Sequence, residues 1–116
     1  MKLIFLLLTV LFLTYSGRDP FLGFDFIYQK GKASWYGDDF QGKLMSNREP
    51  FDKEQNTVAH RRLPLGTEVC IINPANGKRV LAVVTDRGPY KKGRIIDLSE
   101  NLAKELDLHY QGVGMV

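Results

Sequence analysis

Glycine and proline interrupt this chain so often from residue 31 onward that no long helix or strand fits between them. Glycine breaks regular structure through its conformational freedom, and proline through its fixed φ angle and missing N–H. The chain has 116 residues, enough for one small domain with a modest core, and short strands are the expected elements. The breakers are Gly31, Gly37, Gly42, Pro50, Pro64, Gly66, Pro74, Gly77, Gly88, Pro89, Gly93, Gly112 and Gly114.

The clearest unit is a β-hairpin made of two apolar runs, residues 67–73 and 79–85. Both are rich in β-branched residues, and Asn76-Gly77 between them favours a tight turn. The runs are nearly continuous in apolar residues, which predicts strands buried on both sides, although periodicity alone leaves this open. Cys70, the only cysteine, lies in the first run. It cannot form an internal disulfide, and we expect a buried structural thiol rather than a nucleophile.

One short helix is expected over residues 100–106. Ser99 can cap it, Glu100 places a negative charge in its first turn, and three apolar residues form one face. Residues 31–36 and 112–116 have the composition of an opening and a closing strand. Together these elements predict a mostly β domain over residues 31–116, preceded by a linker over residues 17–30.

The first 16 residues have the pattern of a secretory signal peptide. Lys2 precedes an apolar run over residues 3–13, and small residues follow, with cleavage expected between Ser16 and Gly17. The alternative is an uncleaved membrane anchor, but the run is shorter than the ~20 residues that span a bilayer. We therefore expect export to the periplasm or the cell exterior. No cysteine lies near the cleavage site, so a lipid anchor is not expected.

The charge balance argues against a nucleic-acid partner. The formal net charge is +3, and removal of Lys2 with the signal peptide leaves +2. This is too small for nucleic-acid binding, and no basic helix accompanies it. A mildly basic exported domain suits an anionic surface such as a carboxylate-bearing cell wall.

Three polar segments, residues 46–52, 57–67 and 85–99, contain the candidates for chemistry. Asp86 ends an apolar strand before a Gly-Pro turn, where partial desolvation would favour its protonated form. The alternative is a turn-capping aspartate. Glu49 and His60 offer a second carboxylate and an imidazole; each alone could be an ordinary surface or core residue. No His, Cys, Asp or Glu spacing indicates a metal site, and no cofactor is expected.

Aromatic and basic residues near these segments are candidates for binding a sugar chain. Trp35 and Tyr36 could stack on sugar rings or pack in the core, with Trp35 favouring the core. Arg87 and Arg94 could meet polar or anionic groups of a substrate, or form part of a solvated loop.

Taken together, the motifs resemble the rare lipoprotein A (RlpA) family, in order, from about residue 31 to residue 116. Each motif is weak alone, but seven in register are specific. They are Ala33-Ser34-Trp35-Tyr36-Gly37, Asn47-x-Glu49-x-Phe51-Asp52, Thr57-x-Ala59-His60, Leu63-Pro64-x-Gly66-Thr67, Asn76-Gly77, Asp86-Arg87-Gly88-Pro89 and Gly93-Arg94-Ile95-Ile96-Asp97-Leu98-Ser99.

The resemblance implies a six-stranded double-psi β-barrel with one or two short helices. It implies an endolytic peptidoglycan transglycosylase, a carbon–oxygen lyase that cleaves peptide-free glycan strands and leaves 1,6-anhydro ends. The partner would be the glycan strand, and the protein a monomer. The resemblance places the acid/base on Asp86, a charge-stabilising or sugar-positioning carboxylate on Glu49, and an orienting or proton-donating imidazole on His60.

Arg48 departs from the resemblance, because glycine is usual between Asn47 and Glu49, and that loop is expected to differ in shape. Two other functions remain open. One is a non-catalytic, expansin-like wall-binding module; the other is a hydrolase of plant-type polysaccharides, which would use two carboxylates roughly 6.5–9.5 Å apart. The presence of all three polar residues favours the lytic enzyme.

Overall fold

The structure, a computed structural model, describes residues 17–18, 25–26 and 28–116. The expected signal peptide over residues 1–16 lies outside the described residues. Gly17–Arg18 (β1) and Asp25–Phe26 (β2) pair antiparallel as a separate two-stranded sheet. Within the described ranges, no helix is long and apolar enough to cross a membrane.

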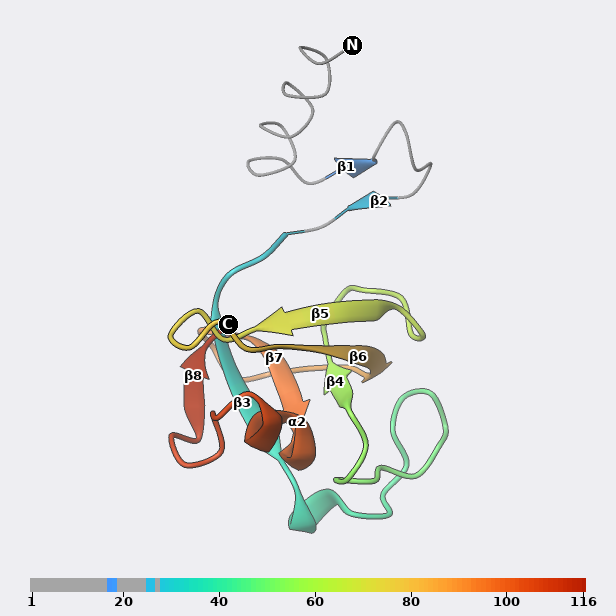
Figure 1. Cartoon of the computed structure of the whole chain (residues 1–116). Coiled ribbons are helices and arrows are strands. Elements are labelled where there is room, and N and C mark those ends of the chain that lie inside the picture. Colours follow the sequence, from blue (N-terminus) through green and yellow to red (C-terminus); the bar gives the residue numbers. More distant parts are fainter. Residues whose placement is uncertain (1–16, 19–24, 27) are drawn as a thin grey trace.

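Six short strands form one strongly curled sheet, as expected for a double-psi β-barrel (Figure 1). The order across the sheet is β5-β6-β4-β7-β3-β8, so neighbours in space are mostly distant in the chain. The pairs β3–β7 and β4–β6 are parallel, and the other pairs are antiparallel. The strands are Lys32–Tyr36 (β3), Thr57–Ala59 (β4), Glu68–Ile72 (β5), Arg79–Asp86 (β6), Arg94–Ser99 (β7) and Val113–Met115 (β8).

The predicted hairpin is confirmed, with β5 and β6 antiparallel and Cys70 opposite Leu81. Gly77 adopts a φ of +74° in the connecting loop, a conformation that glycine reaches without steric cost. Asn73 Nδ2 donates to the Leu106 carbonyl at 2.7 Å. The start of the hairpin loop therefore satisfies a carbonyl that the end of the helix leaves without an intrahelical partner.

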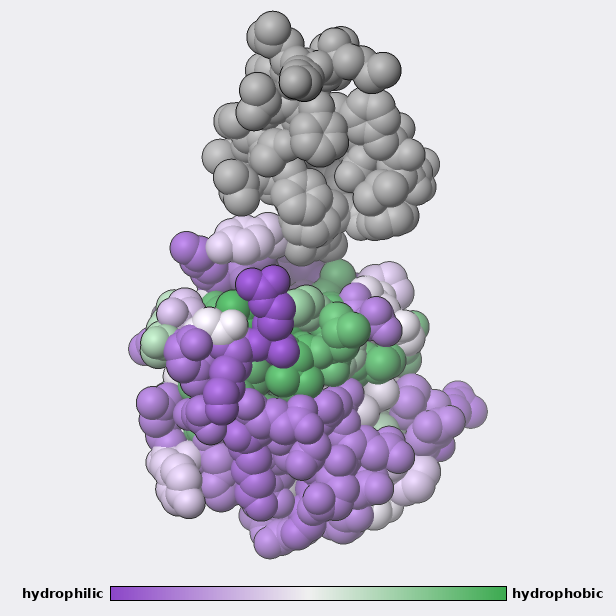
Figure 2. Space-filling view, viewed as in Figure 1, coloured by the Kyte–Doolittle hydropathy of each residue, from purple (hydrophilic) through white to green (hydrophobic). Residues whose placement is uncertain are grey.

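The expected burial of this hairpin on both faces is wrong. Exposure alternates along β5 and along most of β6, so only one face packs on the core. Cys70 is exposed and not buried, because its outward-facing side chain lies on an edge strand with no layer over it. Leu81, opposite Cys70, is 59% exposed. Figure 2 shows a green, hydrophobic area over β5 and β6.

The core lies inside the curl of the sheet and is closed by the helix Glu100–Glu105 (α2). The predicted cap is confirmed, since Ser99 Oγ accepts a hydrogen bond from Leu102 N at 3.4 Å. The helix buries its short apolar face against the strands. The buried core residues are Ala33, Val58, Ile71, Ala82, Val84, Ile96, Leu98, Leu102, Ala103, Leu106 and Leu108.

A second, smaller apolar layer covers the outer face of the sheet where the chain runs from β3 to β4. This segment, residues 37–56, begins with a short 3₁₀ turn, Asp38–Phe40 (η1). Phe51, 2% exposed, packs its ring 4.5 Å from the ring of Tyr36. Met45 is also buried, and its sulfur accepts from Thr85 Oγ1. Residues 37–56 are thus seated on β3 and β6, next to the end of β6.

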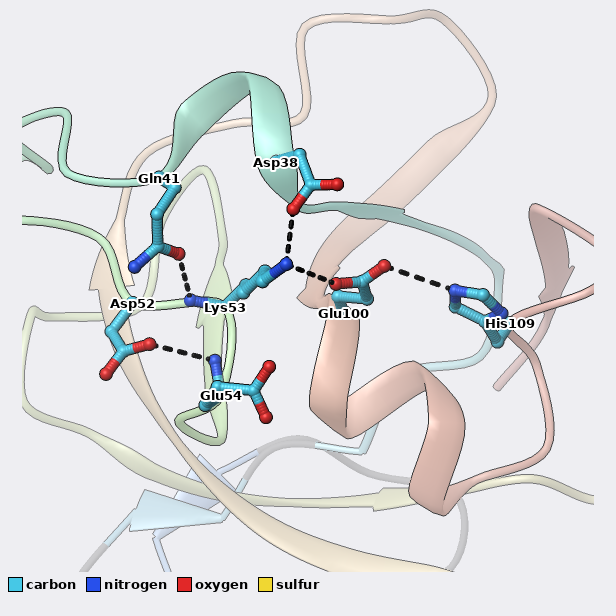
Figure 3. Close-up of polar contacts among 7 residues, drawn as sticks. All are labelled: Asp38, Gln41, Asp52, Lys53, Glu54, Glu100 and His109. Carbon is cyan, nitrogen blue, oxygen red and sulfur yellow. Dashed lines mark hydrogen bonds and ion pairs between the residues drawn. The ribbon is translucent and has the colours of Figure 1, made fainter.

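A chain of charged side chains fastens residues 37–56 to α2 (Figure 3). Lys53 pairs with Asp38 and, at 3.8 Å, with Glu100 in the first turn of the helix. Glu100 Oε1 lies 3.3 Å from His109 Nε2, and Gln41 Oε1 accepts from Lys53 N at 2.9 Å. Solvent-screened ion pairs contribute little to stability, so this network mainly fixes where the segment lies.

The exposure of Cys70 gives a direct test of the fold. In the native protein, we expect a thiol reagent to label Cys70 at nearly the rate seen in denaturant, because no side-chain layer covers it. Cys70→Ser should change the free energy of unfolding by no more than about 0.5 kcal/mol, as for other surface substitutions. Native protection of Cys70 by a factor of a hundred or more would contradict the open outer face of β5.

Candidate active site

A β-bulge sets the direction of the Asp86 side chain. Strands β4 and β6 pair in parallel, with Val58 opposite Val84, but the register then shifts so that Ala59 lies opposite Asp86. The extra residue, Thr85, breaks the strict alternation along β6. Bulges commonly re-aim a side chain next to an active site. Here the shift places Asp86, at the end of β6, in register with Ala59 on the next strand.

Glu49 directly follows a three-residue hairpin loop, residues 46–48. Arg48 N donates to Met45 O, and Met45 N donates to Glu49 O, both at 2.9 Å. Arg48 has a φ of +69°, the left-handed conformation that this loop type requires at its third position. Glycine is favoured there because it has no Cβ, which accounts for the usual glycine in the resembling motif. Arg48 adopts this conformation despite the steric cost.

This loop is fastened to the end of β6 through Asp86. Asp86 Oδ1 accepts hydrogen bonds from Ser46 N at 2.9 Å and from Ser46 Oγ at 2.7 Å. It also accepts from Arg87 N at 2.8 Å. Asn47 N donates to the Thr85 carbonyl at 3.1 Å. Asp86 Oδ1 is therefore fixed by three donors from two segments, while Oδ2 has no hydrogen-bond partner among the described residues.

His60, directly after β4, organises the next turn. Its Nδ1 accepts from Arg62 N and Leu63 N at 3.1 and 3.0 Å, so the neutral ring carries its proton on Nε2. Nε2 lies 3.0 Å from Gln29 Oε1. The backbone N–H of His60 donates to the Asp86 carbonyl at 3.1 Å.

The ionisation of His60 is disfavoured by its surroundings. Burial lowers the pKa of its imidazole below the ordinary value, and the charges of Arg61, Arg87 and Arg62 lower it further. The ring is therefore neutral near pH 7, and its visible contacts organise the backbone next to Asp86.

Two arginines connect the loops around the site through hydrogen bonds to backbone carbonyls. Arg87 Nη1 donates to the carbonyls of His60 and Leu63, at 3.0 and 2.6 Å. Arg61 Nη1 donates to the carbonyls of Pro89 and Arg94, at 3.0 and 2.6 Å. The guanidinium of Arg87, expected to bind substrate, is thus engaged with backbone carbonyls.

The structure brings Glu49, His60 and Asp86 to the same end of β4 and β6, through the contacts of their backbones. Glu49 is exposed, and its side chain has no hydrogen bond or ion pair within the described residues. Tyr36 lies on the outer face with its hydroxyl buried and without a partner in the described structure. Burial raises the pKa of this hydroxyl above its ordinary value, and the charges of Asp86 and Asp97 add to that rise.

Trp35 is not brought to this face. It packs against the core, stacks on His109 with ring centroids 4.5 Å apart, and donates from Nε1 to the His109 carbonyl at 3.1 Å. Trp35 and Tyr36 are neighbours in a strand, so their side chains lie on opposite faces. Arg94 begins β7, is partly exposed, and lies opposite Lys32.

Three polar residues at the site were not singled out from the sequence. Ser46 holds Asp86 Oδ1, and Ser34 Oγ donates to Asp97 Oδ1. Asp97 is partly buried on β7, and burial is the first cause that raises the pKa of its carboxyl above the ordinary value. The usable signal for Ser34 and Asp97 was alternation, since both are single polar residues between apolar neighbours in strands. Ser46 gave no such signal, because its contact with Asp86 forms only when the loop at residues 46–48 packs against the end of β6.

Comparisons with known proteins place the chain in a family. A family model described as "Lytic transglycolase" matches residues 28–116. Curated relatives include the "Probable endolytic peptidoglycan transglycosylase RlpA" of Synechocystis, 46% identical over 74% of this chain. The RlpA proteins of Rickettsia felis and Vibrio cholerae are 45% and 44% identical, each over 76% of this chain. The matches cover 27%, 40% and 34% of those relatives, so this chain spans well under half of their length.

A solved structure supports the fold assignment. The Streptomyces papain inhibitor superposes with a TM-score of 0.59 and 26% sequence identity. The match covers 77% of this chain and 92% of the inhibitor. A similar fold therefore occurs in a protein named as a papain inhibitor.

The left-handed conformation of Arg48 predicts that Arg48→Gly stabilises the protein. Removing the side chain relieves a steric cost of about 1–2 kcal/mol, against about 0.5–1 kcal/mol of extra backbone entropy in the unfolded chain. The expected net gain is about 0.5–1 kcal/mol in the free energy of unfolding, measured by chemical denaturation. Arg48→Ala is the matched control, because it removes the guanidinium but keeps the Cβ, and it should give no gain. Equal effects of the two substitutions would refute the argument.

The lowered pKa of His60 predicts a loss of stability in mild acid. The unfolded chain binds a proton at His60 near pH 6.5, whereas the folded protein binds it only at lower pH. The free energy of unfolding should therefore fall as the pH drops from about 7.5 to about 5.5. His60→Asn supplies an acceptor for the same turn but does not titrate, so its stability should depend less on pH in this window. Parallel curves for the two proteins would contradict the prediction.

Proposed function

The chain belongs to the RlpA family of lytic transglycolases, and from this premise we propose that it is an endolytic peptidoglycan transglycosylase acting on peptide-free glycan strands. Its proposed place of action is the periplasm or the cell exterior, where that polymer lies. The names of the relatives support the reaction class. The proposed product is a glycan with a 1,6-anhydro end, formed without added water.

The fixed Asp86 carboxyl group is the observation that carries this proposal. Because three donors use Oδ1, a proton on this group sits on Oδ2. A carboxyl group with one oxygen anchored and the other free can present its proton in a defined direction. This is what a general acid requires when it meets a glycosidic oxygen.

In the proposed reaction, Asp86 acts first as acid and then as base. Its Oδ2 proton passes to the glycosidic oxygen as the bond between that oxygen and the anomeric carbon breaks. The 6-hydroxyl oxygen of the same sugar bonds to the anomeric carbon, and its proton passes to the Asp86 carboxylate. One bond breaks and one forms, and Asp86 ends with its proton restored.

Glu49 and His60 support this step in different ways. The exposed Glu49 carboxylate makes no hydrogen bond or ion pair with other described residues, so it is free to stabilise the positive charge that develops on the sugar ring. His60 orients Asp86, since its backbone N–H holds the Asp86 carbonyl and its ring holds the adjoining turn. We assign His60 to positioning and Glu49 to charge stabilisation.

A second candidate function is wall binding without cleavage, as in an expansin-like module. The same barrel occurs in a protein named as a papain inhibitor and not as a glycan-cleaving enzyme, so the fold alone does not imply cleavage. The engagement of Arg87 with backbone carbonyls also leaves fewer free groups at the site. Both candidates use the same glycan partner, so product analysis separates them.

We expect Asp86→Asn to abolish cleavage, because an amide of the same shape cannot donate the carboxylic proton. The loss should be at least about 10²-fold, toward the upper end of the 10²–10⁴ range for general acid–base catalysis. The measurement is turnover of purified peptide-free glycan, with mass spectrometry of the product ends. Anhydro ends support the transglycosylase, reducing ends indicate a hydrolase, and binding without products indicates the wall-binding module.

Asp107→Asn is the matched control for that experiment. It removes one carboxylate beyond the end of α2, where Asp107 pairs with Lys78 on the surface. Asparagine tolerates the φ of +59° at this position, so the fold should be kept. Thermal melts of both variants check folding. A folded Asp86→Asn protein with the activity of the Asp107→Asn control would overturn the assignment.

A further inference from the structure

The outer face of the β5–β6 hairpin carries an exposed apolar patch. Cys70 and Ile72 face outward from β5, and Leu81 and Val83 face outward from β6. Leu81 is 59% exposed, and Ile72 and Val83 are 38% and 37% exposed. The four side chains belong to the hydrophobic area over these two strands (Figure 2). Apolar side chains that cluster on a surface mark an interaction site, whereas single ones need no explanation.

The chain itself covers only part of this outer face. At the Thr85 end of β6, residues 37–56 lie over the sheet, and the buried Met45 contacts Thr85. Among the described residues, no segment continues this layer over the first half of β6, where the outward-facing side chains are exposed. The apolar layer therefore stops partway along the strand, and a second layer would remove the remaining apolar surface from water.

Two opposite charges lie at diagonal corners of the patch. The antiparallel register gives three outward-facing pairs across the hairpin, which are Glu68–Val83, Cys70–Leu81 and Ile72–Arg79. Both charged side chains are exposed. The acidic corner is thus at one end of the patch on β5, and the basic corner is at the other end on β6.

This arrangement of charges is complementary to itself. A two-fold axis that crosses the strands at the central pair reverses the strand direction, so the acidic end of one copy lies over the basic end of the other. The sideways offset is one strand spacing, about 4.8 Å, which the long side chains of Glu68 and Arg79 can span. A two-fold axis along the strands would instead place each charge over an apolar residue, where desolvation of an unpaired charge is costly. The charges therefore select the first orientation.

We propose that the outer face of β5 and β6 is the interface of a symmetric homodimer. A second copy of this chain packs face to face across Cys70 and Leu81, and Glu68 of each copy pairs with Arg79 of the other. Such reciprocal contacts are the property of a two-fold interface. This inference is independent of the proposed reaction, and it replaces the monomer that the family resemblance implied.

The size of the patch sets the strength of the dimer. A standard interface buries about 800 Å² per partner, more than three residue pairs on two strands provide. The dimer is therefore weak and forms as the protein concentration rises. Arg79 begins β6 and Asp86 ends it, so the candidate site lies toward the far end of the strand from the basic corner. Each copy in the dimer keeps its own site.

The first test is sedimentation of the protein, as recovered from producing cells, over a range of concentrations. We expect a shift from monomer to dimer below about 1 mM. Leu81→Asp should remove the dimer, because it places two unpaired carboxylates at the centre of the interface. Leu44→Asp is the matched control, since Leu44 is 74% exposed and lies outside the patch, and it should associate like the wild type. A wild type that stays monomeric over this range overturns the proposal.

Exchange of the two charges tests the orientation. Glu68→Arg and Arg79→Glu should each weaken the dimer about tenfold, because like charges then face each other at two places. An equimolar mixture of the two single variants should recover the wild-type affinity as a heterodimer, since every facing pair is again of opposite charge. The double variant E68R/R79E should recover it as well. A mixture that associates no better than either variant alone rules out the two-fold arrangement.

Cys70 reports directly on the same face. In dilute protein Cys70 should react freely with a thiol reagent, and its labelling should slow as the dimer forms. A short bifunctional thiol reagent should join two copies of the wild type and of Leu44→Asp, but not of Leu81→Asp, because Cys70 lies beside the two-fold axis. Association without protection of Cys70 overturns the proposal, because the interface then lies elsewhere.

Thermal melts check that the variants fold. Should Leu81→Asp fail to fold, the mixture of the charge variants still decides the proposal. Protection of Cys70 in a protein that stays monomeric would show that another group, such as the chain before β3 or a glycan, covers the patch. That result also overturns the homodimer.

Discussion

The hydrogen bonds between Ser46 and Asp86 join the two halves of the site. One half is the end of β6, and the other is the hairpin loop at residues 46–48. A carboxylate that accepts backbone and hydroxyl donors is a strong acceptor, and these contacts are short. Without them, the loop before Glu49 would be held against the end of β6 by the contacts of Asn47 and of the buried Met45 with Thr85. Ser46 therefore contributes directly to the relative position of the two candidate carboxylates.

The segment over residues 37–56 makes that contact possible from a distance. Its two buried side chains, Met45 and Phe51, seat it on the outer face of the sheet. Lys53 and Glu100 then anchor its far end to the helix. Burial of a large apolar side chain contributes about 1.5–3 kcal/mol, whereas a solvent-screened ion pair contributes little. Packing thus provides the stability of the segment, and the charged network provides its placement.

The site combines a rigid inner part with an open outer part. The carbonyls and ring nitrogens around His60 are engaged with Arg87 and with the backbone of its own turn. Glu49, in contrast, extends from the loop without a side-chain partner among the described residues. This division suits the proposed function, in which an acid is held in a fixed direction while a glycan strand enters. The family relatives named as endolytic enzymes are consistent with such an open arrangement.

The sequence by itself determined the hairpin, the helix and the family of this protein. Frequent breakers set the strand lengths, Asn76-Gly77 marked the hairpin, and Ser99 marked the start of the helix, because each of these signals is local. The motifs around Glu49, His60 and Asp86 gave the family, which the comparisons confirmed.

Tertiary structure alone decided which faces are covered and which residues meet. The exposure of Cys70 followed from the edge position of β5, which no run of apolar letters reveals. The register that sets Ser34 opposite Asp97 and Ala59 opposite Asp86 depends on strands that are adjacent in space but not in sequence, and on a one-residue register shift. Register and packing are long-range properties, so the contact between Ser34 and Asp97 became visible only in the folded chain.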